Sequence, residues 1–176
     1  MNQNIEIKAH ARDFAHLQEI AAQLSDHPPQ TIYQIDTFFP CPHGRLKLRT
    51  LAPNRGELIF YQRANQTQPK PSHYLLTPTT SPDTLRDTLT TALGILGTVR
   101  KERLLYRTGS TRIHLDTVEE LGRFLELEVV LQPDQTPPSG IALAHNLLQE
   151  LEIQPRDLID RAYIDLLLEK NPSTAS

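Results

Sequence analysis

The segment NIEIKAH, from Asn4 to His10, alternates polar and apolar residues. One face carries Ile5, Ile7 and Ala9, and the other carries Asn4, Glu6, Lys8 and His10. Successive side chains of a β-strand point to opposite sides, so this period of two predicts a strand with one buried apolar face. The polar face either contacts solvent, as on most antiparallel sheets, or lines an interior around a charged group.

The same alternation recurs along the chain. Further alternating segments are GRLKLRT (44–50), ELIFYQR (57–63), KPSHYLL (70–76), KERLLYR (101–107), RIHLD (112–116) and FLELEVVL (124–131). Pro71 lacks a backbone N–H, which predicts an edge or irregular strand for the segment that begins at Lys70. About seven or eight strands with few helices predict an α+β fold, built on a closed or nearly closed antiparallel barrel.

Helical spacing of apolar residues predicts four flanking helices. They cover Phe14 to Leu24, the segment after Ser81 up to Gly94, Ile141 to Leu151, and Pro155 to about Glu169. Pro82 at the first helical position and Gly94 at the end support the second of these helices.

Length and composition are typical of one globular domain with a single core. The chain has 176 residues, a formal net charge of -3 and one cysteine, Cys41, which excludes an internal disulfide and a multi-cysteine zinc site. No apolar run reaches the roughly 20 residues of a membrane span, and the N-terminus has no pattern of a secretory signal. We therefore expect a cytoplasmic protein that binds neither membranes nor nucleic acid.

Charge is distributed unevenly between the strands and the rest of the chain. The polar strand faces hold nine of the 18 Lys and Arg residues but four of the 21 Asp and Glu residues. The basic ones are Lys8, Arg45, Lys47, Arg49, Arg63, Lys70, Lys101, Arg103 and Arg112, and the acidic ones are Glu6, Asp116, Glu126 and Glu128. One such row is typical of a solvated face, but the rows together favour an interior site for a polyanion such as a triphosphate. Glu6, Glu126 and Glu128 supply hard oxygen ligands suited to Mg²⁺ or Mn²⁺.

Several of these motifs resemble a known family. NIEIKA, QIDTFF followed by GRLKLR, LIFYQR followed by KPSHY, RKERLLYR, and RIHLDTVEELGRFLELEVV are similar to the CYTH superfamily, the triphosphate tunnel metalloenzymes. Their order and spacing are most similar to the class IV adenylate cyclase branch. The resemblance implies one CYTH domain over residues 1–170, an eight-stranded antiparallel barrel with a hydrophilic tunnel, and, in this branch, a homodimer. The last residues, NPSTAS (171–176), predict a disordered tail.

The resemblance also implies roles for the charged residues. All nine basic side chains would contact phosphates, with Lys8, Lys101 and Arg103 as catalytic cations. Glu6, Glu126 and Glu128 would bind Mg²⁺ or Mn²⁺, and Asp116 would be a further ligand or an orienting partner. One departure is Asn4, which stands where the family usually has the first Glu of its Glu-x-Glu-x-Lys motif. An amide oxygen brings no charge, so we expect one weaker metal site.

Three functions are compatible with these residues. As a class IV adenylate cyclase, the first alternative, the protein would convert ATP to cyclic AMP and pyrophosphate. As a triphosphatase it would hydrolyse tripolyphosphate or a nucleoside triphosphate. As a binding module it would hold a triphosphate or polyphosphate without turnover. The uncharged Asn4 at the first Glu position of the motif is the reason to consider this alternative.

Overall fold

The computed structural model describes residues 2–172, so residues 173–176 of the expected tail lie outside the described residues. The elements, in chain order, are β1 (Asn2–His10), α1 (Phe14–Leu24), β2 (Gln30–Phe39), β3 (Arg45–Ala52), β4 (Arg55–Arg63), β5 (Lys70–Thr79), α2 (Pro82–Leu93), β6 (Gly97–Thr108), β7 (Thr111–Val118), β8 (Gly122–Val130), α3 (Pro137–Glu150), the 3₁₀ turn η1 (Pro155–Asp157), β9 (Leu158–Ile159) and α4 (Tyr163–Lys170).

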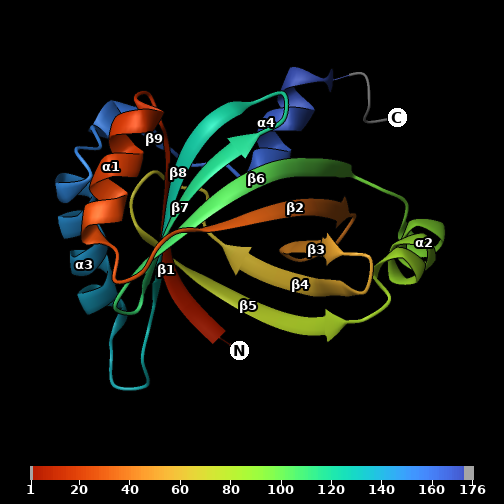
Figure 1. The fold of residues 1–176 in the computed structure, drawn as a ribbon. Coiled ribbons are helices and arrows are strands. Elements are labelled where there is room, and N and C mark those ends of the chain that lie inside the picture. The colour runs from red at the N-terminus through yellow and green to blue at the C-terminus, as the bar shows by residue number, and fades with distance from the viewer. Residues whose placement is uncertain (1, 173–176) are drawn as a thin grey trace.

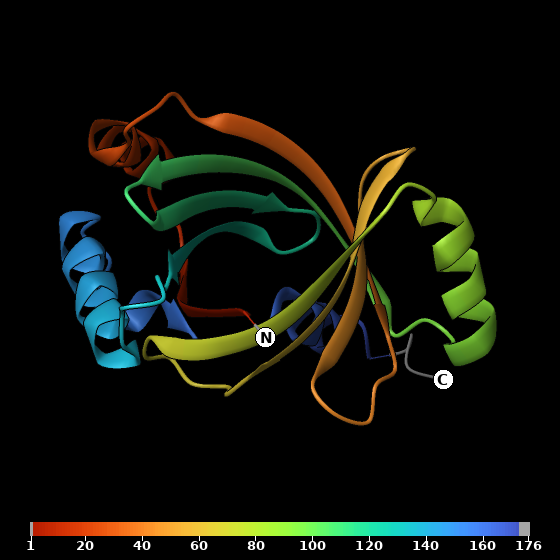
Figure 2. The same ribbon diagram turned by 90° about the horizontal axis from the view of Figure 1, so that it is seen from below.

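The long strands form a closed antiparallel barrel, which confirms the predicted fold class. Their order around the barrel is β5-β4-β3-β2-β6-β7-β8-β1, and β1 pairs with β5 to close it. Figure 2 shows β2, β6 and β7 on one side of the enclosed space and β5 on the other. Because neighbours are antiparallel, the alternate strands β1, β7, β2 and β4 all run in the same direction.

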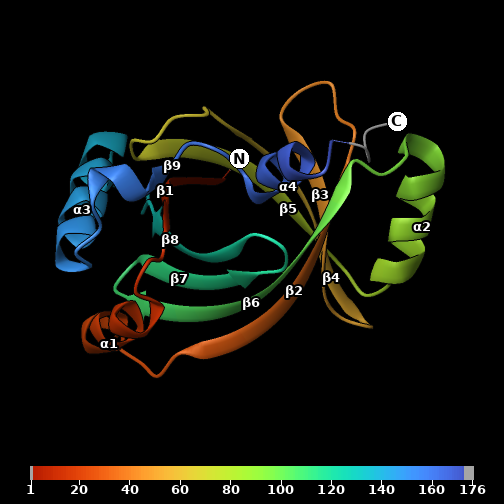
Figure 3. The same ribbon diagram turned by 90° about the horizontal axis from the view of Figure 1, so that it is seen from above.

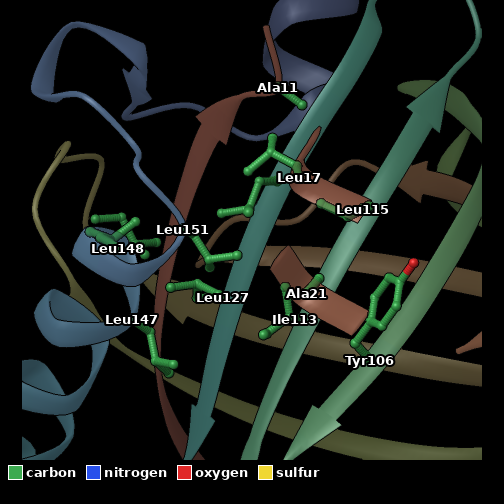
Figure 4. Packing of buried hydrophobic residues seen from close by; sticks show 12 residues of the cluster. Ala11, Leu17, Ala21, Tyr106, Ile113, Leu115, Leu127, Leu147, Leu148 and Leu151 are labelled. Atoms are coloured by element: carbon green, nitrogen blue, oxygen red, sulfur yellow. The ribbon is translucent and has the colours of Figure 1, made fainter. Parts of the chain in front are cut away.

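The largest apolar cluster of the core lies outside the barrel wall. The outward side chains of β1, β7 and β8, such as Ile7, Ile113 and Leu127, are fully buried. They pack in one cluster with Leu17 of α1 and Leu147 of α3 (Figure 4). In Figure 1, α1 and α3 lie on the same side of the barrel, and α2 lies at the opposite side. Burial of each large apolar side chain contributes roughly 1.5–3 kcal/mol, so these two helices stabilise the wall from outside.

A fourth helix, α4, lies near one end of the tunnel, which we call the α4 end. Tyr163, the first residue of α4, packs in a cluster with Phe38 of β2 and Phe124 of β8. Its hydroxyl donates a hydrogen bond to Asp116 of β7 at 2.9 Å. Figure 3 shows α4 over the strands, away from α1. The later residues of β1, β2 and β7 therefore lie toward the α4 end, and their earlier residues lie toward the other end, which we call the mouth.

The single helix expected from Pro155 to Glu169 is wrong. The structure has η1, the two-residue strand β9 and the shorter helix α4 in that range. Ile159 and Leu158 pair with Lys8 and Ala9 of β1, so hydrogen bonds to a distant strand override the local helical spacing. None of the helices within residues 2–172 is long and apolar enough to cross a membrane.

Of the two alternatives predicted from Pro71, an edge or an irregular strand, the edge strand is wrong, because β5 pairs with both β1 and β4. Pro71 lies opposite Ile5 of β1, and pairing with β4 begins one residue later, at Ser72. The backbone nitrogen of Pro71, which carries no hydrogen, therefore lies where β5 pairs with β1 but not with β4. Helix α1 has the predicted bounds, whereas α3 begins at Pro137, earlier than the predicted Ile141.

Candidate functional site

The barrel encloses a cavity of about 490 Å³, and all eight long strands contribute side chains to its lining. Glu6 and Lys8 of β1 line it, while Ile5 and Ile7 face the core. The polar face of the first strand thus lies inside the tunnel.

Seven of the nine predicted basic residues line the cavity. They are Lys8, Lys47, Arg49, Arg63, Lys101, Arg103 and Arg112. Residues two apart on a strand point to the same side. Lys47 and Arg49 therefore face the cavity together from β3, and Lys101 and Arg103 do so from β6. Arg55 and Arg107, which the sequence analysis did not select, also line it.

The other two predicted basic residues do not line the cavity. Arg45 donates a hydrogen bond at 2.7 Å to Asp165 of α4, which fixes that helix against β3. Lys70 is buried and donates to the backbone oxygen of Gln66 in the loop before β5. Burial lowers the pKa of Lys70 to about 8, and Arg63 lowers it as well.

Three of the four predicted metal ligands line the cavity, and each is held by a cation. Glu6 lies 2.7 Å from Arg63, and Glu128 lies 2.9 Å from Arg112. Glu126 contacts both Lys8, at 3.0 Å, and Arg103, at 2.8 Å. The described residues contain no group of three or more His, Cys, Asp or Glu side chains placed to hold a metal ion as they stand.

The chemistry of these carboxylates nevertheless fits a hard divalent cation. Glu6 and Glu128 lie directly opposite each other on β1 and β8, and like charges in that position repel. Burial raises the pKa of Glu6, and the nearby Glu126 raises it further. A cation among the three side chains would relieve this repulsion with oxygen ligands of the kind that Mg²⁺ and Mn²⁺ prefer. It would take the place of the present ion pairs.

The fourth, Asp116, lies in the wall behind the cavity and is fully buried. It accepts hydrogen bonds from Arg103 Nε at 2.6 Å and Nη2 at 2.7 Å. It also lies 3.4 Å from Lys101 Nζ. Burial opposes its ionisation, but Arg103 and Lys101 outweigh that effect and hold the pKa of Asp116 below its usual range. In this position Asp116 fixes two of the predicted catalytic cations.

Asp36 on β2 fixes two cations of β3 in the same way as Asp116 fixes two cations of β6. The sequence analysis did not select Asp36. Its carboxylate is buried and accepts from Lys47 at 2.8 Å and from Arg49 at 2.9 Å. Burial would raise its pKa, but Arg49 and Lys47 hold the pKa of Asp36 well below its usual range. The available signal was the alternation of Gln34, Asp36 and Phe38 within β2.

The sequence analysis also missed Tyr163 as a tunnel residue. Lys8 Nζ lies 3.8 Å from the centre of its ring, and Lys101 Nζ lies 5.0 Å from it. Such a stack is a cation–π contact. Burial raises the pKa of the Tyr163 hydroxyl well above its usual range, and Asp116 raises it further. The hydroxyl is therefore a hydrogen-bond donor that orders the α4 end.

Charge remains unbalanced in the lining even after ion pairing. Among the described residues, nine Lys and Arg side chains face five carboxylates, those of Glu6, Asp36, Glu57, Glu126 and Glu128. Arginine forms forked hydrogen bonds with phosphate oxygens, and lysine gives a mobile point charge. The arrangement is suited to holding a polyanion along the tunnel.

Comparison with solved structures shows the same fold. The chain matches the PH1012 protein from Pyrococcus horikoshii OT3 with a TM-score of 0.82 and 20% identity, covering 93% of this chain and 98% of that one. It matches a putative adenylate cyclase from Vibrio parahaemolyticus with a TM-score of 0.79 and 18% identity, covering 94% and 98%. It matches HpAC1 from Hippeastrum, a putative adenylyl cyclase with a dominant triphosphatase activity, with a TM-score of 0.65 and 16% identity, covering 98% and 96%.

A comparison with curated proteins finds no match. The model of the CYTH domain family, in contrast, matches residues 2–163, nearly the whole chain. The family that the sequence motifs resemble is thus the family whose model matches. The chain belongs to the CYTH domain family.

Proposed function

We propose that this protein is a divalent-cation-dependent enzyme that binds a nucleoside triphosphate in its tunnel, with conversion of ATP to cyclic AMP and pyrophosphate as its reaction. The observation that carries the proposal is the excess of nine basic over five acidic side chains around one cavity of about 490 Å³. A triphosphate supplies several negative charges in a row and would neutralise that excess.

Lys8, Lys101 and Arg103 are the proposed catalytic cations. Lys8 and Arg103 both contact Glu126, so they meet at one place in the tunnel. Asp116 fixes Arg103 with two hydrogen bonds, which pre-orders the guanidinium before substrate arrives. Cations held in this way stabilise the charge that develops on phosphate oxygens, and such positioning supplies most of the catalysis in phosphoryl transfer.

Lys47, Arg49, Arg63 and Arg112 are the proposed remaining phosphate contacts of the lining. Arg45 and Lys70, which do not line the cavity, would support it instead, Arg45 by holding α4 and Lys70 by holding the loop before β5. Seven of the nine basic residues predicted from the sequence would thus contact the substrate, and the other two would support the site from behind. Arg55 and Arg107 complete the nine basic side chains of the lining.

Glu6, Glu126 and Glu128 are the proposed metal ligands, and Asp116 is the proposed orienting partner. Bound Mg²⁺ or Mn²⁺ would neutralise charge on the phosphates. When the triphosphate occupies Lys8, Arg63, Arg103 and Arg112, these cations pair with phosphate oxygens and release the three carboxylates for that role.

In the cyclase reaction the ribose 3′-oxygen attacks the α-phosphorus in line. The new bond joins that oxygen to phosphorus, the bond from the α-phosphorus to the bridging oxygen breaks, and pyrophosphate leaves with its electron pair. The hydroxyl proton passes to solvent. The tunnel residues would hold the phosphates in line with the attacking oxygen.

Hydrolysis at the terminal phosphorus is the second candidate. It is supported by the position of Glu126 beside Lys8 and Arg103, because a water held there would lie next to the cations that bind phosphate. The neighbour from Hippeastrum, with its dominant triphosphatase activity, has the same fold.

A product assay tests the proposal. The purified protein is given ATP or inorganic tripolyphosphate, with Mg²⁺ and separately with Mn²⁺, and cyclic AMP, pyrophosphate and orthophosphate are resolved. Cyclic AMP with pyrophosphate is the expected result. Orthophosphate without cyclic AMP would favour the hydrolase. No product from either substrate, with binding of the triphosphate retained, would indicate a binding module.

A further inference from the structure

Two of the nine basic side chains that line the tunnel differ from the others in having no partner. Seven have a carboxylate oxygen within 3.4 Å of a side-chain nitrogen. The guanidinium groups of Arg55 and Arg107, in contrast, form no ion pair or hydrogen bond with any of residues 2–172. The proposed function gives neither arginine a role.

Arg55 and Arg107 both lie at the mouth of the tunnel. Arg55 is the first residue of β4, which runs in the same direction as β1, and Arg107 is the last residue but one of β6, which runs the opposite way. In the register of β6 and β7, Arg107 lies directly opposite Arg112, another cation of the lining. Like charges in that position repel, so the mouth favours the approach of an anion.

The two ends of the tunnel also differ in exposure. At the α4 end the lining is at most 6% exposed, and its side chains there are those of Phe38, Val99, Ala162 and Tyr163. The hydrogen bond from Arg45 to Asp165 holds α4 against this end. At the mouth, Arg55 and Arg107 are exposed, and Leu76 is 40% exposed. The lining therefore meets solvent at the mouth.

The charge of the whole protein opposes the approach of a polyanion. The formal net charge is -3, so an anion far from the surface meets a repulsive field. Positive side chains at the entrance of a cleft reverse that field locally and raise the rate of encounter. Exposed charges at the edge of a site act mainly on the association rate, whereas buried paired charges act mainly on dissociation. Arg55 and Arg107 are of the first kind.

We propose that Arg55 and Arg107, which we call the arginine rim, attract phosphate-bearing anions and make the mouth the entrance of the tunnel. The inference rests on the proposed function, because it takes a triphosphate as the molecule that enters. The rim brings the triphosphate to the mouth, and the deeper cations Lys8, Lys101 and Arg103 then hold it.

Stopped-flow fluorescence tests the proposal. The probe is ATP that carries an N-methylanthraniloyl group on its ribose, mixed in the presence of Mg²⁺ with the wild-type protein or with the double variant Arg55→Gln, Arg107→Gln. Its association rate constant comes from the dependence on protein concentration, and its dissociation rate constant comes from displacement by excess tripolyphosphate.

We expect the double variant to associate about three- to tenfold more slowly at an ionic strength of about 0.01 M, where charges act over about 30 Å. The dissociation rate constant should change less than about twofold, because the deeper cations are intact. The difference in association should shrink as the ionic strength rises toward about 1 M, where charges act over about 3 Å.

The double variant Arg100→Gln, Arg156→Gln is the matched control. Both arginines are exposed and lie outside the lining, and their removal changes the net charge by the same amount. Arg100 belongs to β6, as Arg107 does, but lies near the α4 end of that strand. The control should associate at the wild-type rate to within about twofold. The single variants Arg55→Gln and Arg107→Gln keep the test valid if the double variant folds poorly.

The possible results separate this proposal from the proposed function. An unchanged association rate in the rim variants, or equal slowing in the control, would overturn the rim while leaving triphosphate binding intact. Faster dissociation with unchanged association would also overturn it, because the two arginines would then hold the bound ligand. Failure of the wild-type protein to bind the probe would overturn both proposals.

Discussion

Asp36 and Arg49 form a two-point ion pair across neighbouring strands, with Nε 2.9 Å from Oδ1 and Nη2 3.2 Å from Oδ2. The same carboxylate accepts from Lys47. Two tunnel cations thus depend on one buried negative charge.

Removing that charge in Asp36→Asn should destabilise the free protein by about 3 kcal/mol, because two buried cations lose their partner. Tripolyphosphate should then raise the melting temperature more in the variant than in the wild type, since its charges replace the missing carboxylate. Thermal melts with and without the ligand measure both effects. Asp87→Asn on the exposed face of α2 is the control, and an equal ligand effect in both proteins would contradict the prediction.

Lys101 should make triphosphate binding dependent on pH. Burial lowers the pKa of Lys101 to about 7, and Arg103 lowers it as well. Free Lys101 is therefore largely uncharged at pH 8, and a bound polyanion favours its protonated form. We expect tripolyphosphate binding at pH 8 to take up a proton, and affinity to fall as the pH rises through 7.

Calorimetry in buffers with different ionisation enthalpies measures this proton uptake. Lys101→Arg is the comparison, because a guanidinium stays charged throughout this range. The variant should take up fewer protons and show a shallower decline in affinity. Identical proton uptake in the two proteins would show that Lys101 does not titrate on binding.

Glu126 should be required for turnover but not for binding. Glu126→Gln keeps the shape of the side chain and removes the charge that would hold the metal. We expect turnover with Mg²⁺ or Mn²⁺ to fall on the order of a hundredfold or more, as when one charge-stabilising group is lost. Tripolyphosphate affinity should be retained, since Lys8 and Arg103 lose a competing partner. Glu102→Gln, at an exposed residue of β6, is the control. Full activity of Glu126→Gln would show that Glu126 is not a metal ligand.

Asn4→Glu should strengthen cation binding at the start of β1. The new carboxylate lies two residues from Glu6 on the same face and adds to the repulsion that a divalent cation relieves. The free variant should melt at a lower temperature than the wild type, and Mn²⁺ should raise its melting temperature more. Turnover at limiting Mn²⁺ should increase. An unchanged response to Mn²⁺ would place the metal away from Asn4.

Leu127 should contribute to stability without affecting the tunnel. It is fully buried on the outer face of β8, beneath the helices. Leu127→Ala should reduce the free energy of unfolding by about 2–5 kcal/mol and leave the tripolyphosphate affinity of the folded protein unchanged. Leu75→Ala, at a residue that is 51% exposed, should change stability by less than about 0.5 kcal/mol. A large affinity change in Leu127→Ala would contradict the separation of core and tunnel.

The barrel was predictable because its main signal is local. Alternation of side chains follows from strand geometry, so Glu6 and Lys8 had to share a face opposite Ile5 and Ile7. The uneven sign of the charges then indicated that this face lies inside, and the structure places both residues in the tunnel.

Features that depend on distant strands were not predictable in this way. The pairing of Leu158 with Ala9 decides that the chain is extended there, and no local pattern reports it. Arg45 and Lys70 bind partners outside the lining, Asp165 of α4 and the backbone oxygen of Gln66, and no strand pattern reports either contact. Asp36 was missed because β2 carries no row of basic residues, so its face lacked the signal that selected the other strands.

Within residues 2–172, the main apolar cluster, which includes Ile113, Leu127 and Leu147, shares no residue with the lining of the tunnel. Substitutions inside the tunnel therefore leave the main stabilising contacts of the fold in place. Over evolutionary time such a barrel can exchange one substrate for another through a few internal changes that leave this apolar cluster intact. The same separation makes this protein a suitable scaffold for engineering new anion-recognising catalysts.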